Sequence, residues 1–131
     1  MTEKTYKYWL KSADLDLQTA RNLFQSGEYP WALFVGHLTI EKLFKAYHAK
    51  FIDPKVPYRH SLVLLAQKCK MNLPESEIDF LDELSSFNIA ARYPDSKFQF
   101  YKKCTMTFTR KYLGKIEELA QRLKEHIAHE K

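Results

Sequence analysis

The chain has 131 residues, of which 45% are hydrophobic and 28% charged, and its formal net charge is +5. This length suits one domain with a single core and is too short for two, so we expect a single globular domain over residues 1–131. No run of about 18 apolar residues is present, and residues 1–6 are too polar for a signal peptide, so we expect a cytoplasmic protein without a membrane span.

Apolar residues recur at helical spacing through the first half of the chain. In residues 6–24 they alternate steps of three and four, which predicts an amphipathic helix that ends at Gly27. Residues 29–51 are apolar on most sides. They therefore predict the central, most buried helix, with Pro30 in its first turn.

The next segments predict a loop, a short helix and a longer helix. Two prolines within residues 53–58 indicate a connecting loop, and Ser61 is a candidate N-cap for the short helix that follows. The longer helix is predicted to start near Pro74 and to stop before Pro94. Its predicted buried stripe is Ile78, Leu81, Leu84, Asn88 and Ala91.

The end of the chain predicts one more helix. Residues 95–103 are expected to form a loop or irregular turn, and the last helix is expected to run from about residue 103 to residue 128. No alternating strand pattern appears anywhere. The predicted fold is therefore all-α, an antiparallel up-and-down bundle of four long helices plus one short helix.

Charge is spread unevenly along the chain. Residues 71–91 carry five acidic residues and no Lys or Arg, whereas residues 92–131 carry ten basic residues against five acidic ones. Such a distribution could steer an anionic ligand or join two copies through opposite faces, although solvated helix faces explain many runs of this kind.

A corner that contains an arginine ends the fourth predicted helix. Because Pro94 disfavours helical geometry at Tyr93, Arg92 and Asp95 should lie at the mouth of the helix rather than along its side. On residue types alone, Arg92 is either a clamp that pairs with Asp95 or a contact for an anion.

A polar stripe runs along the central helix. His37, Glu41 and Lys45 fall at steps of four, with Lys42 beside them. Such a stripe faces either solvent or a cleft or subunit interface. The residue types favour the first alternative, a Glu41–Lys45 ion pair on a solvated seam.

A second basic group lies at the head of the short helix. Arg59 and His60 follow the proline-rich loop, where they could hold a phosphate, or His60 could simply close the start of the helix. No Ser-His-Asp or Cys-His arrangement is legible, so we treat this pair as secondary to the main site and assign no catalytic residue.

No metal site or cofactor is predicted. The spacing of His37 and Glu41 would suit a metal, but two ligands without a third are too few. Cys69 and Cys104 are isolated, so they indicate neither a metal nor a disulfide.

Large apolar side chains suggest a contact between two copies of the chain. Trp9, Trp31 and the Phe98–Tyr101 cluster exceed what a bundle of this size easily buries, so we expect a homodimer. Around that cluster, residues 97–103 interleave cations with aromatic rings. This pattern suits base stacking on a nucleic acid or packing against a partner helix.

Three segments together resemble the HEPN family of small helical, nucleotide- and RNA-associated bacterial domains. They are the corner Ala91-Arg92-Tyr93-Pro94-Asp95, the helix segment His37–Ala46 with its Glu-Lys-x-x-Lys-Ala core, and the basic segment Tyr58–Leu62. The resemblance spans about residues 6–127. It implies an all-helical domain that binds a nucleotide or an RNA phosphate in a cleft.

The resemblance also suggests roles for individual residues and a partner. Arg92 with Lys42 or Lys45 would contact the anion, Asp95 would orient Arg92, and Tyr93 would shape the wall of the cleft. His37 and Glu41 would lie in the same cleft. Domains of this family are often encoded with a minimal nucleotidyltransferase in toxin–antitoxin-like pairs, so such an enzyme is an expected partner.

Family members that cut RNA carry an arginine followed, after four to six residues, by a histidine. None of residues 93–99 is histidine, so the corner at Arg92 departs from this pattern. A literal match, Arg122 to His129, lies at the C-terminal end, where one chance match is expected in a chain of this size. We therefore expect binding rather than catalysis. The alternatives are a degenerate metal-independent ribonuclease and a helical interaction module without a ligand.

Overall fold

The computed structural model describes the backbone of residues 2–129 and the side chains of residues 4–93 and 98–129. The described backbone forms six helices and no strand, which confirms the all-α class. The helices are α1 (Thr2–Gln25), α2 (Tyr29–Phe51), α3 (Leu62–Lys68), α4 (Glu75–Ala90), α5 (Pro94–Lys103) and α6 (Met106–His129).

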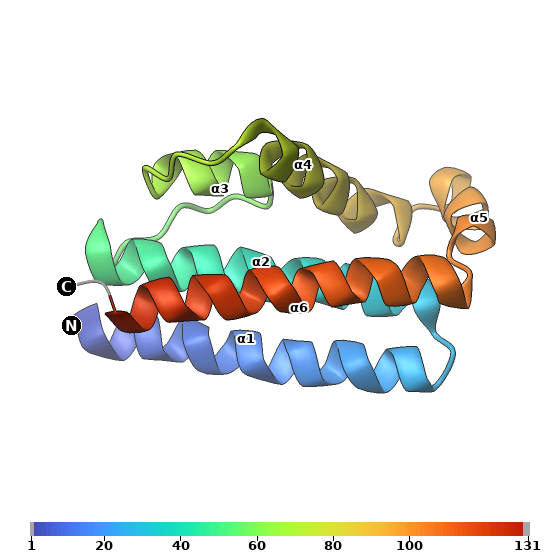
Figure 1. Cartoon of the computed structure of the whole chain (residues 1–131), viewed down its shortest axis with the longest axis horizontal. Coiled ribbons are helices and arrows are strands. Elements are labelled where there is room, and N and C mark those ends of the chain that lie inside the picture. The colour runs from blue at the N-terminus through green and yellow to red at the C-terminus, as the bar shows by residue number, and fades with distance from the viewer. Residues whose placement is uncertain (1, 130–131) are drawn as a thin grey trace.

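Three long helices lie side by side, and α2 is the central one. It packs against α1 and α6, and the layer formed by α3 and α4 covers another of its sides (Figure 1). Because it has neighbours on most sides, its apolar residues are buried around the helix, including Leu33, Ile40 and Phe44. The predicted central helix is therefore confirmed, with bounds at Tyr29 and Phe51.

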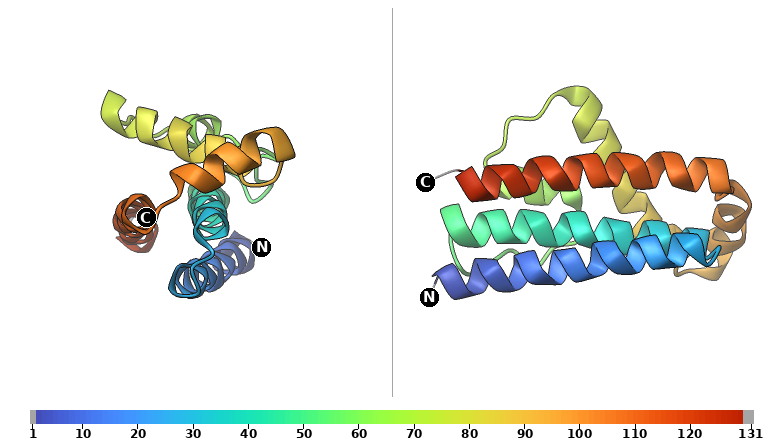
Figure 2. Two further views of the ribbon diagram at one scale, coloured as in Figure 1. Left: turned by 90° about the vertical axis from the view of Figure 1, so that its right-hand side faces the viewer. Right: turned by 60° about the horizontal axis from the view of Figure 1, so that its bottom comes forward.

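The expected antiparallel four-helix bundle is not what the chain forms. α6 runs in the same direction as α2, and α4 lies across the axes of α1, α2 and α6 rather than alongside them (Figures 1 and 2). α6 runs parallel to α2 because the segment α3–α4–α5 returns the chain to the end of the molecule where α2 begins.

Two local expectations were wrong. Residues 95–103 were expected to form a loop, but they belong to α5, in which Pro94 occupies the first turn, a position that suits its fixed φ angle. Ile78 was expected in the buried stripe of α4 but is 39% exposed, whereas Phe87 is buried and packs against Phe100 of α5.

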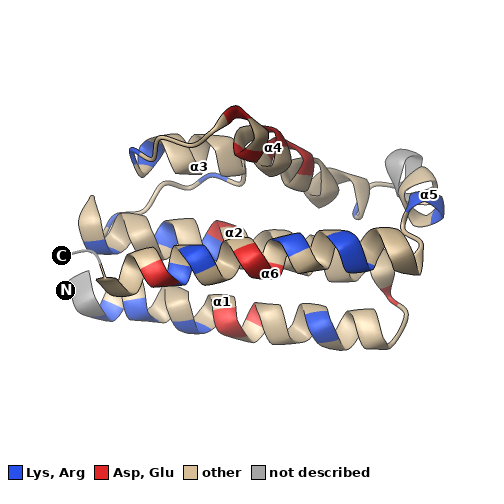
Figure 3. Ribbon diagram, viewed as in Figure 1, with Lys and Arg blue, Asp and Glu red and all other residues tan. Residues whose placement is uncertain are grey.

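Opposite charges meet between α4 and α6. Acidic residues gather at the start of α4, while Lys and Arg are spaced along α6 (Figure 3). Nη1 of Arg122 lies 3.1 Å from a carboxylate oxygen of Glu77, and the hydroxyl of Tyr112 donates to Glu83. Two of the acidic residues of α4, Glu77 and Glu83, therefore help to hold α4 against α6.

The two cysteines are both buried and reduced. Burial raises the pKa of Cys69 and that of Cys104 to about 12, and the thiol of Cys69 donates to the carbonyl of Phe44. Both are therefore packing residues.

Among the residues described, no helix combines the length and the apolar composition that crossing a bilayer requires.

Candidate functional site

A buried carboxylate lies at the centre of the polar cluster. Glu41 of α2 is only 4% exposed, and both of its oxygens have partners. Nζ of Lys45 lies 3.1 Å from Oε2, and Nδ1 of His60 lies 3.1 Å from Oε1. A buried charge requires such partners, because desolvation otherwise outweighs its favourable interactions. The predicted Glu41–Lys45 ion pair is thus present. The prediction that it lies on a solvent-exposed helix face was wrong, because both residues are buried.

His60 belongs to this cluster although sequence reasoning treated it as secondary. Its Nδ1–H donates to Glu41, and its side chain remains 61% exposed. Its backbone carbonyl lies 3.2 Å from Nε2 of His37, so the residue is tied to α2 at two points. The next residue, Ser61, caps α3 by accepting a hydrogen bond from the N–H of Leu64. The start of α3 therefore holds His60 in place.

His37 lies beneath the cluster and is completely buried. A carbonyl can only accept, so Nε2 of His37 carries the proton that it donates to His60. Nδ1 is then an acceptor, and it has no hydrogen-bond partner among the described residues. Burial lowers the pKa of His37, Glu41 opposes this effect, and the positive charge of Arg92 adds to it. Arg92 approaches the same part of α2, because its guanidinium lies over the ring of Phe34, three residues before His37.

Arg92 lies just beyond the end of α4, as predicted, and is exposed. Its Nε donates to the carbonyl of Asn88 across 2.9 Å, and its guanidinium carbon lies over the rings of Phe34, at 5.7 Å, and Tyr93, at 5.4 Å. Among the described side chains no carboxylate forms an ion pair with it. The side chain of Asp95 lies outside the described residues, so its pairing with Arg92 remains a prediction.

Lys42 and Lys45 of α2, which were predicted to contact an anion, both pair with carboxylates. Nζ of Lys42 lies 2.7 Å from Oδ2 of Asp16, so Lys42 faces α1 rather than the cluster. Lys45 pairs with Glu41, and its Nζ also lies 5.3 Å from the ring centre of Trp9. Both positive charges are thus paired with a carboxylate, and a role for either lysine in contacting an anion remains a prediction.

Arg59 lies outside the cluster, in the exposed loop before α3. With Lys55, Tyr58 and Lys68 it lines an open groove of about 660 Å³. The structure therefore separates the predicted pair, because His60 joins the buried cluster whereas Arg59 faces solvent.

Among the described residues, no group of three or more His, Cys, Asp or Glu side chains could hold a metal ion.

Two contacts of the site were not identified from the sequence. The pairing of His60 with Glu41 joins residues 19 apart across a loop, and Phe34 provides a ring surface for an arginine 58 positions later (92 − 34). No periodicity or motif connects such distant positions. The sequence holds one weak indication of the second contact: Phe34 precedes the polar stripe by less than one turn of the helix.

Comparison with known proteins agrees with this fold. The model of the HEPN domain matches residues 6–128, nearly the whole chain, so the protein belongs to the HEPN domain family. The crystal structure of TT1696 from Thermus thermophilus superimposes with a TM-score of 0.77 and 22% sequence identity, covering 92% of this chain and 96% of that one. At this identity the similarity shows the fold alone. No curated protein matched the sequence.

Proposed function

We propose that this HEPN-domain protein binds a phosphate group of a nucleotide or an RNA on the surface formed by Arg92 and His60, here called the Arg92–His60 surface. The main support is that the buried carboxylate of Glu41 holds the exposed imidazole of His60 in one orientation. Groups that bind ligands are commonly fixed by a second layer of hydrogen bonds in this way.

The hydrogen bonds of His60 leave one ring nitrogen for a ligand. Because Nδ1–H donates to Glu41, Nε2 is the remaining polar atom of the ring, and it has no hydrogen-bond partner among the described residues. In its charged form the imidazole donates from both nitrogens, so Nε2 could donate to a phosphate oxygen while Nδ1 stays bound to Glu41.

Arg92 supplies a positive charge to the same surface. Among the described residues only its Nε has a hydrogen-bond partner, so its terminal amino groups remain available for the paired contacts that arginine makes with phosphate. The rings of Phe34 and Tyr93 limit the positions that the guanidinium can adopt. Lys42 and Lys45 each pair with a carboxylate, so Arg92 is the main source of positive charge for the phosphate.

A binding titration with nucleotides and short RNA tests this proposal. Arg92→Ala should weaken binding about 10- to 100-fold, because a hydrogen bond to a charged group contributes about 1.5–3 kcal/mol. Arg110→Ala is the matched control, since Arg110 is an exposed arginine of α6 and its loss changes the net charge equally. Equal loss in both variants would indicate a general charge effect, and equal affinity of Arg92→Ala and wild type would reject the site.

A homodimer remains part of the proposal, supported by exposed apolar side chains near the junction of α4 and α5. Ile89, Tyr93 and Phe98 are 56%, 52% and 68% exposed. Phe98→Glu should therefore shift the protein toward the monomer in light scattering. Leu15→Glu on α1, where Leu15 is 61% exposed, should leave the oligomeric state unchanged. A wild-type monomer at tens of micromolar would reject the dimer.

A nucleotidyltransferase partner is proposed on family membership alone. If the two proteins act as a toxin–antitoxin-like pair, the gene beside this one should encode a minimal nucleotidyltransferase, and the two products should purify together. A neighbouring gene without such a product would remove the support for this partner.

A further inference from the structure

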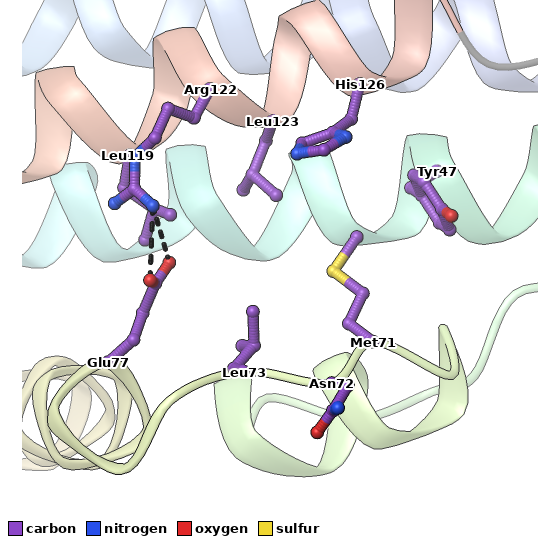
Figure 4. Close-up of a pocket in the computed structure, with 9 residues that line it drawn as sticks. All are labelled: Tyr47, Met71, Asn72, Leu73, Glu77, Leu119, Arg122, Leu123 and His126. Carbon is purple, nitrogen blue, oxygen red and sulfur yellow. Dashed lines mark hydrogen bonds and ion pairs between the residues drawn. The ribbon is translucent and has the colours of Figure 1, made fainter.

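A cavity of about 240 Å³ lies between α6, α2 and the segment that joins α3 to α4, and neither Arg92 nor His60 lines it. Figure 4 shows Leu123 of α6 and Leu73 of the connecting segment pointing toward one another across it, with Met71 extending into it beside them. Met71 and Leu73 are only half-buried. Apolar side chains that line a pocket in this way offer contact surface to an apolar part of a ligand.

A paired charge forms one edge of the same cavity. Nη1 of Arg122 contacts both carboxylate oxygens of Glu77, at 3.2 and 3.1 Å, and the side chain of Glu77 is only 14% exposed (Figure 4). Nε and Nη2 of Arg122 have no hydrogen-bond partner among the described residues. Each oxygen of Glu77 can accept a further hydrogen bond. The edge therefore offers both donors and an acceptor while its two charges cancel.

Size and charge together define the class of ligand. The volume lies below the roughly 300–1,000 Å³ of sites for drug-sized molecules, so it suits a molecule of one ring. The Leu and Met side chains favour an apolar ring face. A net charge on the ligand would be attracted by one member of the Arg122–Glu77 pair and repelled by the other, which favours an uncharged molecule.

We propose that this cavity binds an uncharged, planar single-ring molecule whose edge carries both a donor and an acceptor, as an amide does. The ring would lie between Leu73 and Leu123. The carbonyl oxygen would accept from Arg122, and the N–H would donate to Glu77. The pyrimidine bases belong to this chemical class. The site is separate from the Arg92–His60 surface and does not depend on it.

Three probes of nearly equal shape separate the effect of charge from that of size: benzamide is neutral, benzoate is an anion and benzamidine is a cation. Each is titrated into the full-length protein and followed by the backbone amide NMR signals of residues 71–73 and 119–126. Benzamide, and uracil as a second neutral probe, should give saturable shifts with a Kd of about 1 mM, the range that such small molecules reach. Tighter binding of benzoate or benzamidine to the wild type, or no saturable shift with benzamide, would overturn the proposal.

Removal of one charge should change which probe binds best. Arg122→Met leaves Glu77 uncompensated, so benzamidine should become the tightest probe. Glu77→Gln leaves Arg122 uncompensated, so benzoate should become the tightest. An unchanged preference in either variant would show that the probes do not contact this pair.

A cavity-filling variant tests the location. Leu73→Trp should place a large ring in the cavity and abolish benzamide binding, whereas Leu64→Trp, at a position 44% exposed on α3, should not. Arg92→Ala should also bind benzamide normally, so this proposal and that of the phosphate site can fail separately. Undiminished binding to a folded Leu73→Trp protein would place the probe elsewhere.

Discussion

Nδ1–H of His60 donates a hydrogen bond to Oε1 of Glu41 across 3.1 Å, and this contact joins the loop before α3 to the buried face of α2. Lys45 holds the other oxygen of the same carboxylate. The three residues therefore form one network in which Glu41 and Lys45 are nearly buried and the imidazole of His60 is exposed to solvent.

The first prediction concerns the buried ion pair. Glu41→Ala should lower the free energy of unfolding by about 3–5 kcal/mol, because it leaves the charge of Lys45 buried without a partner. The double variant Glu41→Leu/Lys45→Met should recover most of that loss, since both charges are then replaced by apolar groups of similar size. Urea denaturation measures both. A double variant as unstable as Glu41→Ala would show that the ion pair itself is required.

The second prediction concerns pH. Burial lowers the pKa of His37 below its usual 6.5, so the unfolded chain binds a proton that the folded protein excludes. Stability should therefore be complete above about pH 6.5 and fall on acidification, by at most about 1.4 kcal/mol per pH unit, until the lowered pKa is reached. Thermal melts between pH 7.5 and 5 measure this slope. His37→Gln should make it shallower, and an identical slope in both proteins would assign the effect to other groups.

The third prediction concerns the contact between α2 and α6. A Cβ atom at Gly36 would lie 2.8 Å from Cδ1 of the buried Ile116, so Gly36→Ala should destabilise the wild type by about 1 kcal/mol. In an Ile116→Val background, which lacks Cδ1, the same change should instead stabilise by up to about 1 kcal/mol, because alanine favours helix more than glycine does. The same sign in both backgrounds would contradict this account of the packing.

Local patterns in the sequence predicted the helices better than their arrangement. The apolar surface of α2 and the cap at Ser61 were correctly predicted because each depends on residues close in the chain. α5 was missed because Pro94 was interpreted only as a helix break, although proline is equally suited to a first turn. The direction of α6 and the oblique path of α4 depend on contacts between distant segments.

The candidate site could be predicted only in part for the same reason. The stripe of His37, Glu41 and Lys45 is visible in the sequence, but a pair of charges four residues apart looks the same on a solvated and on a buried face. Its burial results from the packing of Trp9 and the loop that carries His60 against α2, and no local pattern records either contact.

A double-mutant cycle on nucleotide affinity tests the central claim most directly. Arg92→Ala, His60→Gln and the combined variant are compared with wild type in one titration series, at a fixed salt concentration because phosphate contacts depend on it. If both residues contact the same phosphate, their effects should be non-additive, with an interaction energy of about 0.5–3 kcal/mol. Strictly additive effects, or nucleotide affinity that none of the three variants alters, would contradict a shared phosphate site at Arg92 and His60.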